Sequence, residues 1–178
     1  IRLIRSVLNM KSKLQLLAST ILLLSLISCG IYSFGGVNLD NRVKTVQVDY
    51  FPNNARLIEP SLSQAFTVAL QDIFISQTNL DMVKSGGDVH FSGEITGYRI
   101  NPMTATAEQT AAQNRLTITI QVRYVNKYEE DKDFEQSFSF YHDYDANAQL
   151  VGGVLDEAFQ VIFERITQDI FNASVAQW

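Results

Sequence analysis

Residues 115–125 carry the pattern that most restricts the fold of this chain. From Arg115 to Tyr124, the sequence RLTITIQVRY alternates between polar and apolar side chains without a break. Because successive side chains of a strand point to opposite faces of a sheet, this period of two predicts a strand with one buried and one solvated face. The apolar face of such a sheet has to be covered by a second layer of structure.

Further segments predict strands of this half-buried kind. They are residues 43–50, 89–98 and 134–141. In the second of them we expect Gly93 and Gly97 on the same face as the apolar side chains, where glycine often marks a bulge or close packing. Residues 80–83 fit a short extended piece, and the charged residues 127–133 fit a turn.

Two segments predict amphipathic helices, over residues 62–77 and 151–176. Their apolar side chains recur at spacings of three and four residues, which is the period of a helix with one buried stripe. Ser61, followed three residues later by Gln64, has the form of a capping box and predicts the start of the first helix.

The predicted order is strand–helix–strand–strand–strand–helix, in a single domain over residues 41–178. The arrangement that covers every apolar face is an α+β two-layer sandwich, with a four-stranded mixed sheet and both helices packed on one face. The other face stays open to water or to a hydrated partner. Residues 101–114 predict a long polar loop, which is a candidate functional segment.

The N-terminal region predicts export and lipidation. An apolar run over residues 14–27 follows Lys11 and Lys13, and at about 14 residues it is shorter than the roughly 20 that a membrane-spanning helix needs. We therefore expect a signal peptide over residues 1–28, with translation starting at Met10. The stretch LISC, ending at Cys29, resembles a bacterial lipobox, in which the cysteine thiol receives a diacylglyceryl group.

A lipidated Cys29 would be followed by a tether over residues 29–40. Gly30 stands where an aspartate would signal retention in the inner membrane, so the expected location is the periplasmic leaflet of the outer membrane. The alternative is a transmembrane anchor with an incidental cysteine, which the shortness of the run disfavours.

Charge and cysteine content exclude several function classes. The net charge is −5, and residues 1–28 hold four basic residues and no acid, so the remaining chain is more acidic still. Nucleic-acid binders carry basic patches, so we expect no nucleic-acid partner. A single cysteine leaves no disulfide within the chain and no CxxC motif.

The sequence offers little for catalysis or metal binding. His142, Asp143 and Asp145 follow the predicted strand 134–141, where polar turn residues are expected anyway, and the only other histidine is His90. No second histidine-rich segment completes a metal site, and no G-x-S-x-G, H-E-x-x-H or phosphate-loop motif is present. We predict no enzyme and no cofactor other than the lipid on Cys29, the alternative being a hydrolase that uses His142 with Asp143.

Several stretches, taken in order, are similar to the LptE family of lipopolysaccharide-assembly lipoproteins. They are CGIYSF (29–34), VDYFPNNA (48–55), GEITGY (93–98), NRLTI (114–118), FEQSFS (134–139) and DIFNA (169–173). The resemblance implies a sheet with two helices on one side and no enzymatic activity. It also implies that the chain plugs the lumen of the outer-membrane β-barrel LptD, which passes lipopolysaccharide (LPS) to the outer leaflet.

Direct contact with LPS would require cations for its phosphates and acidic sugars. The candidates are Arg99, Arg115, Arg123 and Lys127, which are scattered along the sequence. Arg99 and Arg115 flank the predicted loop, and Arg123 falls on the open face. The alternative function is a free lipoprotein, facing the periplasm, that carries a small amphiphile or a peptidoglycan fragment.

Overall fold

The computed structural model describes residues 39–103 and 112–175, all within one compact unit that spans residues 36–178. The elements in chain order are β1 (Thr45–Val48), α2 (Leu62–Gln77), β2 (Asp81–Val83), β3 (Val89–Met103), β4 (Gln113–Asn126), the short 3-10 helix η2 (Glu130–Lys132), β5 (Phe134–Asp145) and α3 (Gly153–Val175). The predicted signal peptide, Cys29 and most of the tether lie outside the described residues.

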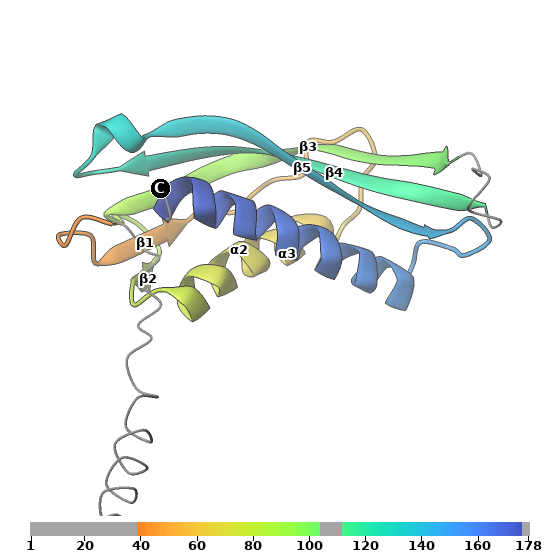
Figure 1. Ribbon diagram of the computed structural model, residues 1–178, viewed down its shortest axis with the longest axis horizontal. Helices are drawn as coiled ribbons and strands as arrows, with labels where there is room; N and C mark the ends of the chain where they lie inside the picture. Colours follow the sequence, from red (N-terminus) through yellow and green to blue (C-terminus); the bar gives the residue numbers. More distant parts are fainter. Residues whose placement is uncertain (1–38, 104–111, 176–178) are drawn as a thin grey trace, which may run out of the picture. The chain divides into compact units, whose positions relative to one another are not determined.

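The described residues form a two-layer α+β unit, with one sheet and both helices on the same side of it (Figure 1). The strand order is β2-β1-β3-β4-β5, with β1 parallel to both its neighbours and the remaining pairs antiparallel. The predicted mixed sheet and helix layer are confirmed. The sheet has five strands rather than four, because β2 has only three residues and is too short to show a period of two.

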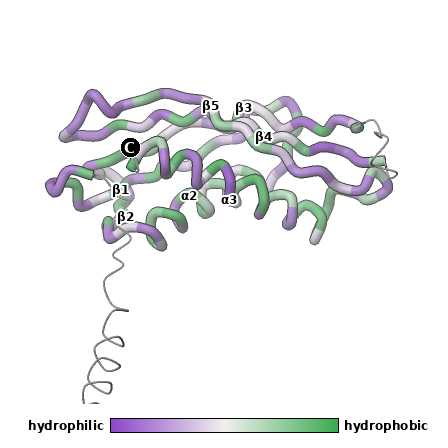
Figure 2. The backbone as a smooth tube through the Cα atoms, in the orientation of Figure 1, coloured by the Kyte–Doolittle hydropathy of each residue, from purple (hydrophilic) through white to green (hydrophobic). Residues whose placement is uncertain are grey.

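The core lies between the sheet and the helices. The apolar side chains of β4 that alternate in the sequence are fully buried. They are Leu116, Ile118, Ile120, Val122 and Tyr124. Figure 2 shows hydrophobic stretches along both helices and hydrophilic residues around the tip that joins β4 to β5. Within the described residues, neither helix combines the length and apolarity needed to cross a bilayer.

Aromatic rings join the two layers. Phe74 of α2 lies 4.6 Å from the ring of Phe91 on β3 and 5.5 Å from Phe171 on α3, measured between centroids. Phe66 contacts Phe163 of α3 at 5.5 Å. Such edge-on and tilted pairs add stabilisation beyond the area they bury. The same rings therefore fix the helices to each other and to the sheet.

Helix α2 spans the predicted residues, but the predicted capping box is wrong. Ser61 already has nearly helical dihedral angles (φ −80°, ψ −18°), and its side chain caps no backbone N–H of the helix. Its hydroxyl instead donates a hydrogen bond to Glu59 Oε1 at 2.7 Å. At the other end, the backbone N–H and the hydroxyl of Thr78 both donate to the Phe74 carbonyl, at 3.0 and 2.6 Å.

A β-bulge between Ile95 and Gly97 changes which face the side chains of β3 point to. Ile95 pairs with the buried Ile120, whereas Gly97 pairs with Thr119 on the opposite face. The prediction that Gly93 and Gly97 share a face is therefore wrong. An extra residue in one strand breaks the period of two, and the sequence pattern alone does not locate it.

The long strands extend further than predicted. Strands β3 and β4 continue to Met103 and from Gln113, so the predicted loop 101–114 is shorter, and its residues 104–111 lie outside the described part of the chain. Strand β5 runs to Asp145, so His142, Asp143 and Asp145 belong to a strand and not to a turn. The three strands pair along their full lengths. Their polar ends do not alternate in hydrophobicity, so the backbone hydrogen bonds to the neighbouring strand keep them extended.

Candidate partner-binding surface

The face of the sheet opposite the helices, called here the open face, is lined mainly by polar side chains. Members from its three long strands are Ser92, Glu94, Thr117, Thr119, Gln121, Arg123, Ser137 and Ser139. The odd-numbered residues of β4 stay partly or fully exposed, while their even-numbered neighbours from Leu116 onward are buried. The open face is therefore hydrated on one side and backed by the core on the other, as the strand pattern predicts.

Arg115 makes several contacts on the open face. Its Nε and Nη2 atoms donate hydrogen bonds to Asp143 Oδ1 and Oδ2 at 2.7 and 2.8 Å, and its guanidinium lies 3.6 Å from the centre of the Tyr141 ring. Hydrogen bonds from Arg115 lower the pKa of the Asp143 carboxyl and outweigh its partial burial. The same pairing raises the pKa of Arg115. The charge of Arg115 is therefore largely neutralised within the sheet.

Arg99 and Arg123 are exposed, and neither forms an ion pair or hydrogen bond through its side chain with any residue in 39–103 or 112–175. Arg123 stands between Ser92 of β3 and Glu135 of β5 in the strand register. Arg99 pairs with Thr117 in the register and is therefore a diagonal neighbour of Arg115. Both guanidinium groups are available to an anionic partner.

Lys127 lies just beyond the end of β4. Its Nζ atom is 3.9 Å from Asp88 Oδ1 and 5.5 Å from the centre of the Tyr128 ring. It follows Arg115 by about 12 positions, which along an extended strand is a separation of about 40 Å. The four predicted cations are therefore not one cluster, and only Arg99 and Arg115 are close neighbours.

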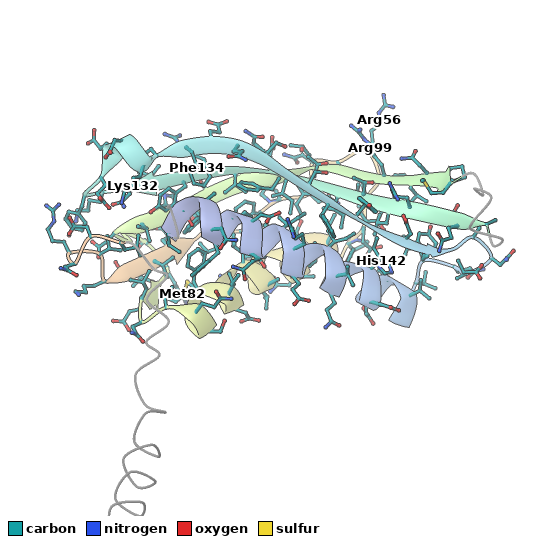
Figure 3. All side chains as sticks on the ribbon, viewed as in Figure 1. Arg56, Met82, Arg99, Lys132, Phe134 and His142 are labelled. Carbon is teal, nitrogen blue, oxygen red and sulfur yellow. The ribbon has the colours of Figure 1, made fainter. Side chains whose placement is uncertain are left out.

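Arg56 is an exposed cation that the sequence analysis did not select. The segment before it runs along β3, because Asn54 N donates to the Ile95 carbonyl and Ile95 N donates to the Pro52 carbonyl, both at 2.9 Å. Figure 3 shows Arg56 and Arg99 both pointing away from the helix layer. No periodic pattern in the sequence marks this segment, because its place beside β3 depends on these long-range hydrogen bonds.

The two histidines do not build a catalytic or metal site. His90 Nε2 lies 2.8 Å from Asp49 Oδ2 and 3.1 Å from Gln47 Nε2. Burial raises the pKa of Asp49, but hydrogen bonds from Gln47 and His90 outweigh it and leave that pKa below its usual value. Within the described residues, no three His, Cys, Asp or Glu side chains are arranged to hold a metal ion.

His142 and Asp143 cannot act as the dyad that a hydrolase would need. They are adjacent in β5, so their side chains point to opposite faces. His142 (labelled in Figure 3) pairs with the buried Leu116, whereas Asp143 pairs with Arg115 on the open face. Among the residues that the structure describes, the open face therefore offers a hydrated surface for binding, and His142 does not form a dyad with Asp143.

Comparison with known proteins assigns a family. A family model described as LptE, lipopolysaccharide-assembly, matches residues 43–174, which is most of the chain. Among curated proteins, none matches this sequence.

Two solved structures that superpose on this chain share little sequence with it. A structure of the hypothetical protein CT253 from Chlamydia trachomatis superposes with a TM-score of 0.50 at 10% identity, covering 71% of this chain and 93% of that protein. A solution structure of an uncharacterized lipoprotein B from Nitrosomonas europaea has a TM-score of 0.46 at 11% identity, covering 79% and 87%. At 10% identity, the similarity to CT253 supports the fold of this chain and nothing about its function.

Proposed function

Because this chain belongs to the LptE family of lipopolysaccharide-assembly lipoproteins, we propose that it binds an LptD-like β-barrel of the outer membrane. In this proposal the chain is anchored through a lipid on Cys29, sits at the periplasmic side of the barrel or inside its lumen, and helps to place LPS in the outer leaflet. The family is not enzymatic and has no cofactor, so this chain is not an enzyme and needs none.

The observation that carries the proposal is the open face of the sheet. The lumen of a large outer-membrane barrel is polar and filled with water. A protein that plugs such a lumen needs a hydrophilic contact surface, with its hydrophobic core closed off elsewhere. The serine, threonine and charged side chains of β3, β4 and β5 supply that surface, and the two helices close the core on the other side.

The anchor follows from the sequence around Cys29, which lies outside the described residues. One acyl chain binds a membrane reversibly, whereas the two or three of a bacterial lipoprotein give stable attachment. The tether 29–40 would connect that lipid to the first strand. Gly30, in place of an acidic retention signal, supports the outer membrane as the destination.

For LPS itself, the candidates divide by their existing contacts. Arg99 and Arg123 have no ionic partner among the described residues, and Arg56 is also exposed. These three are proposed to pair with phosphates, for which the planar guanidinium is well suited. Arg115 and Lys127 are weaker candidates, because Asp143 already neutralises Arg115 and Lys127 lies at the far end of β4.

The test is affinity purification of the full-length, C-terminally tagged chain from detergent-solubilised outer membranes. The expected result is co-purification of an LptD-like barrel in an amount equal to the tagged chain. A chain that is recovered alone, as a monomer, would contradict the proposal and favour a free carrier of small amphiphiles. Lipid extracted from the purified protein would then identify the cargo.

A further inference from the structure

Strand β5 is a long edge strand that lacks the lysine, proline and bulge with which edges are commonly protected, and its charged residues are acidic. It lies at one end of the sheet order and pairs only with β4. All 12 residues of β5 pair with β4 in one unbroken register, so the strand has no bulge. The strand also contains no proline, lysine or arginine. Proteins normally protect an edge with a short strand, a bulge, a proline or a lysine. The opposite edge, β2, has such protection because it is only three residues long.

The ladder between β4 and β5 identifies the backbone groups that β5 leaves unpaired. Ala146 N donates to the carbonyl of Ala112, the residue directly opposite it just beyond the end of the ladder. In an antiparallel pair, hydrogen-bonded positions alternate, so the even-numbered residues of β5 bond to β4. The N–H and C=O groups of the odd-numbered residues then point away from the sheet. They are Glu135, Ser137, Ser139, Tyr141 and Asp143.

The same odd-numbered residues place their side chains on the open face. Within residues 39–103 and 112–175, no backbone group outside the sheet bonds to the N–H or C=O of these five residues. Residues 135–137 are exposed on both faces of β5. A strand laid along this edge would therefore meet a continuous row of donors and acceptors and would extend the open face by one strand.

We propose that β5 accepts an extended segment of a partner polypeptide as a sixth strand, and that this segment carries lysine or arginine on the residues that face the same way as the open face. The proposal rests on the proposed function, under which the segment belongs to the barrel. The charges of β5 specify the partner. Glu135 and Asp145 stand near its two ends, and the strand holds no lysine or arginine of its own. Arg123 of β4 stands opposite Glu135 in the register, but no ion pair joins the two side chains.

A second copy of this chain is a poor occupant of the same edge. In a continuous sheet, residues directly opposite each other share a face, so odd-numbered residues of two antiparallel β5 strands would face one another. In one of the two registers that overlap nearly the whole strand, Glu135 lies opposite Asp145 of the other copy. In the second it lies opposite Asp143, whose charge Arg115 partly offsets. Like charges directly opposite each other destabilise a sheet. The edge is therefore complementary to a cationic strand and not to itself.

The test uses the full-length tagged chain in its native membrane and two variants at one position. Ser137→Pro removes an outward N–H and places a ring against an incoming strand, while the ladder to β4 loses no hydrogen bond. Ser137→Ala leaves the backbone unchanged and is the matched control. We expect Ser137→Pro to lower barrel recovery at least about tenfold, which corresponds to losing one or two hydrogen bonds across the new strand pair, and Ser137→Ala to leave it unchanged.

Amide hydrogen exchange tests the same strand pairing without a mutation, because it measures which amides of β5 are protected. In the free protein, the amides of Ser137, Ser139 and Tyr141 should exchange quickly, and those of Gln136, Phe138 and Phe140 slowly. In the purified complex the first three should become protected. A circular dichroism spectrum of Ser137→Pro that matches wild type establishes that the variant is folded, so that weaker recovery of the barrel reflects a lost interaction.

The outcomes separate this inference from the proposed function. Recovery of the barrel by Ser137→Pro at the wild-type level, with the outward amides still unprotected in the complex, would overturn the β5 assignment and leave the barrel partnership intact. Failure of the wild-type chain to recover any barrel would overturn both. A homodimer that Ser137→Pro dissociates would show that a second copy occupies the edge, against the charge argument.

Discussion

Gly93 is the residue on which the close packing of β3 and β4 most depends. Its φ of +154° is a conformation that L side chains rarely adopt. A Cβ atom placed there would lie 2.0 Å from the carbonyl oxygen of Gln121 and 2.8 Å from Cε1 of Phe51. Only glycine allows β3 to approach both the neighbouring strand and the aromatic ring from the segment after β1.

We predict that Gly93→Ala destabilises the chain by at least about 1–3 kcal/mol, the usual cost of a strained backbone position, with the clash added to it. Gly153→Ala is the control, because a Cβ atom added there would meet nothing within 4 Å and the residue begins α3. Urea unfolding of the purified variants measures both effects. Equal midpoints for Gly93→Ala and wild type would contradict the predicted packing.

The Arg115–Asp143 pair predicts a dependence of stability on pH. Because Arg115 lowers the pKa of Asp143 in the folded state, the pair stabilises the fold above the unfolded pKa of about 3.9 and this contribution is lost as the pH falls through the lower folded value. Both side chains are about a quarter exposed, so solvent screens the pair and we expect a small contribution.

The measurement compares wild type with Asp143→Asn by urea unfolding at pH 6 and at about pH 2.5, which is below the unfolded pKa of aspartate. The variant should be less stable at the higher pH. The difference should shrink at the lower pH, because the contribution of the pair is lost progressively as the pH falls below the unfolded pKa of Asp143. A difference that stays constant across this range would contradict an ionic contribution from the pair.

At the scale of elements, the sequence predicted the structure well where its hydrophobic period is regular. It predicted the structure poorly where that period is interrupted or too short to recognise. The bounds of α2 and the buried side of β4 agree with the sequence pattern, because each repeats its period over many residues. Strand β2 is too short to show a period, and the bulge after Ile95 shifts the pattern of β3 by one residue. The ends of β3, β4 and β5 are polar, so only their pairing with one another makes them strands.

The candidate surface was predictable in composition but not in contacts. The sequence placed Arg123 on a polar face, and its position in β4 agrees with that. The pairing of Arg115 with Asp143 depends on the register between β4 and β5, which single-sequence periodicity does not contain. The same holds for Arg56, whose segment lies along β3 only because of two long-range backbone hydrogen bonds.

Phe74 tests how strongly the helices are fixed to the sheet. It is fully buried between Phe91 and Phe171, whereas its neighbour Ile75 is 58% exposed. We predict that Phe74→Ala costs about 3–5 kcal/mol, as is usual for deleting a buried aromatic ring. Ile75→Ala, the control on the adjacent position, should change stability by less than about 0.5 kcal/mol. Thermal or urea unfolding distinguishes the two, and similar losses would contradict the assigned core face of α2.

At the scale of the whole molecule, the proposed function combines a lipid anchor with a domain whose two sheet faces differ in chemistry. One face is closed by α2 and α3, and the other presents polar and charged groups. This division suits a protein that works by holding a partner in a wet environment, with the anchor restricting it to one membrane surface.

The anchor gives a prediction at this scale. Cys29→Ser should abolish incorporation of labelled palmitate and move the chain out of the outer-membrane fraction, because no other residue of the sequence can receive a thioether-linked lipid. Ser28→Ala keeps a small residue before the cysteine and should be processed normally. Palmitate incorporation by Cys29→Ser at the wild-type level would contradict lipidation at this position.

The most direct test of the central claim is to deplete this chain in its native host and measure how much LPS reaches the cell surface. If the chain assists LPS assembly with a barrel, surface LPS should fall while newly made LPS accumulates inside the envelope, and re-expression of the wild-type chain should restore delivery. Unchanged surface LPS after complete depletion would contradict a role in LPS assembly.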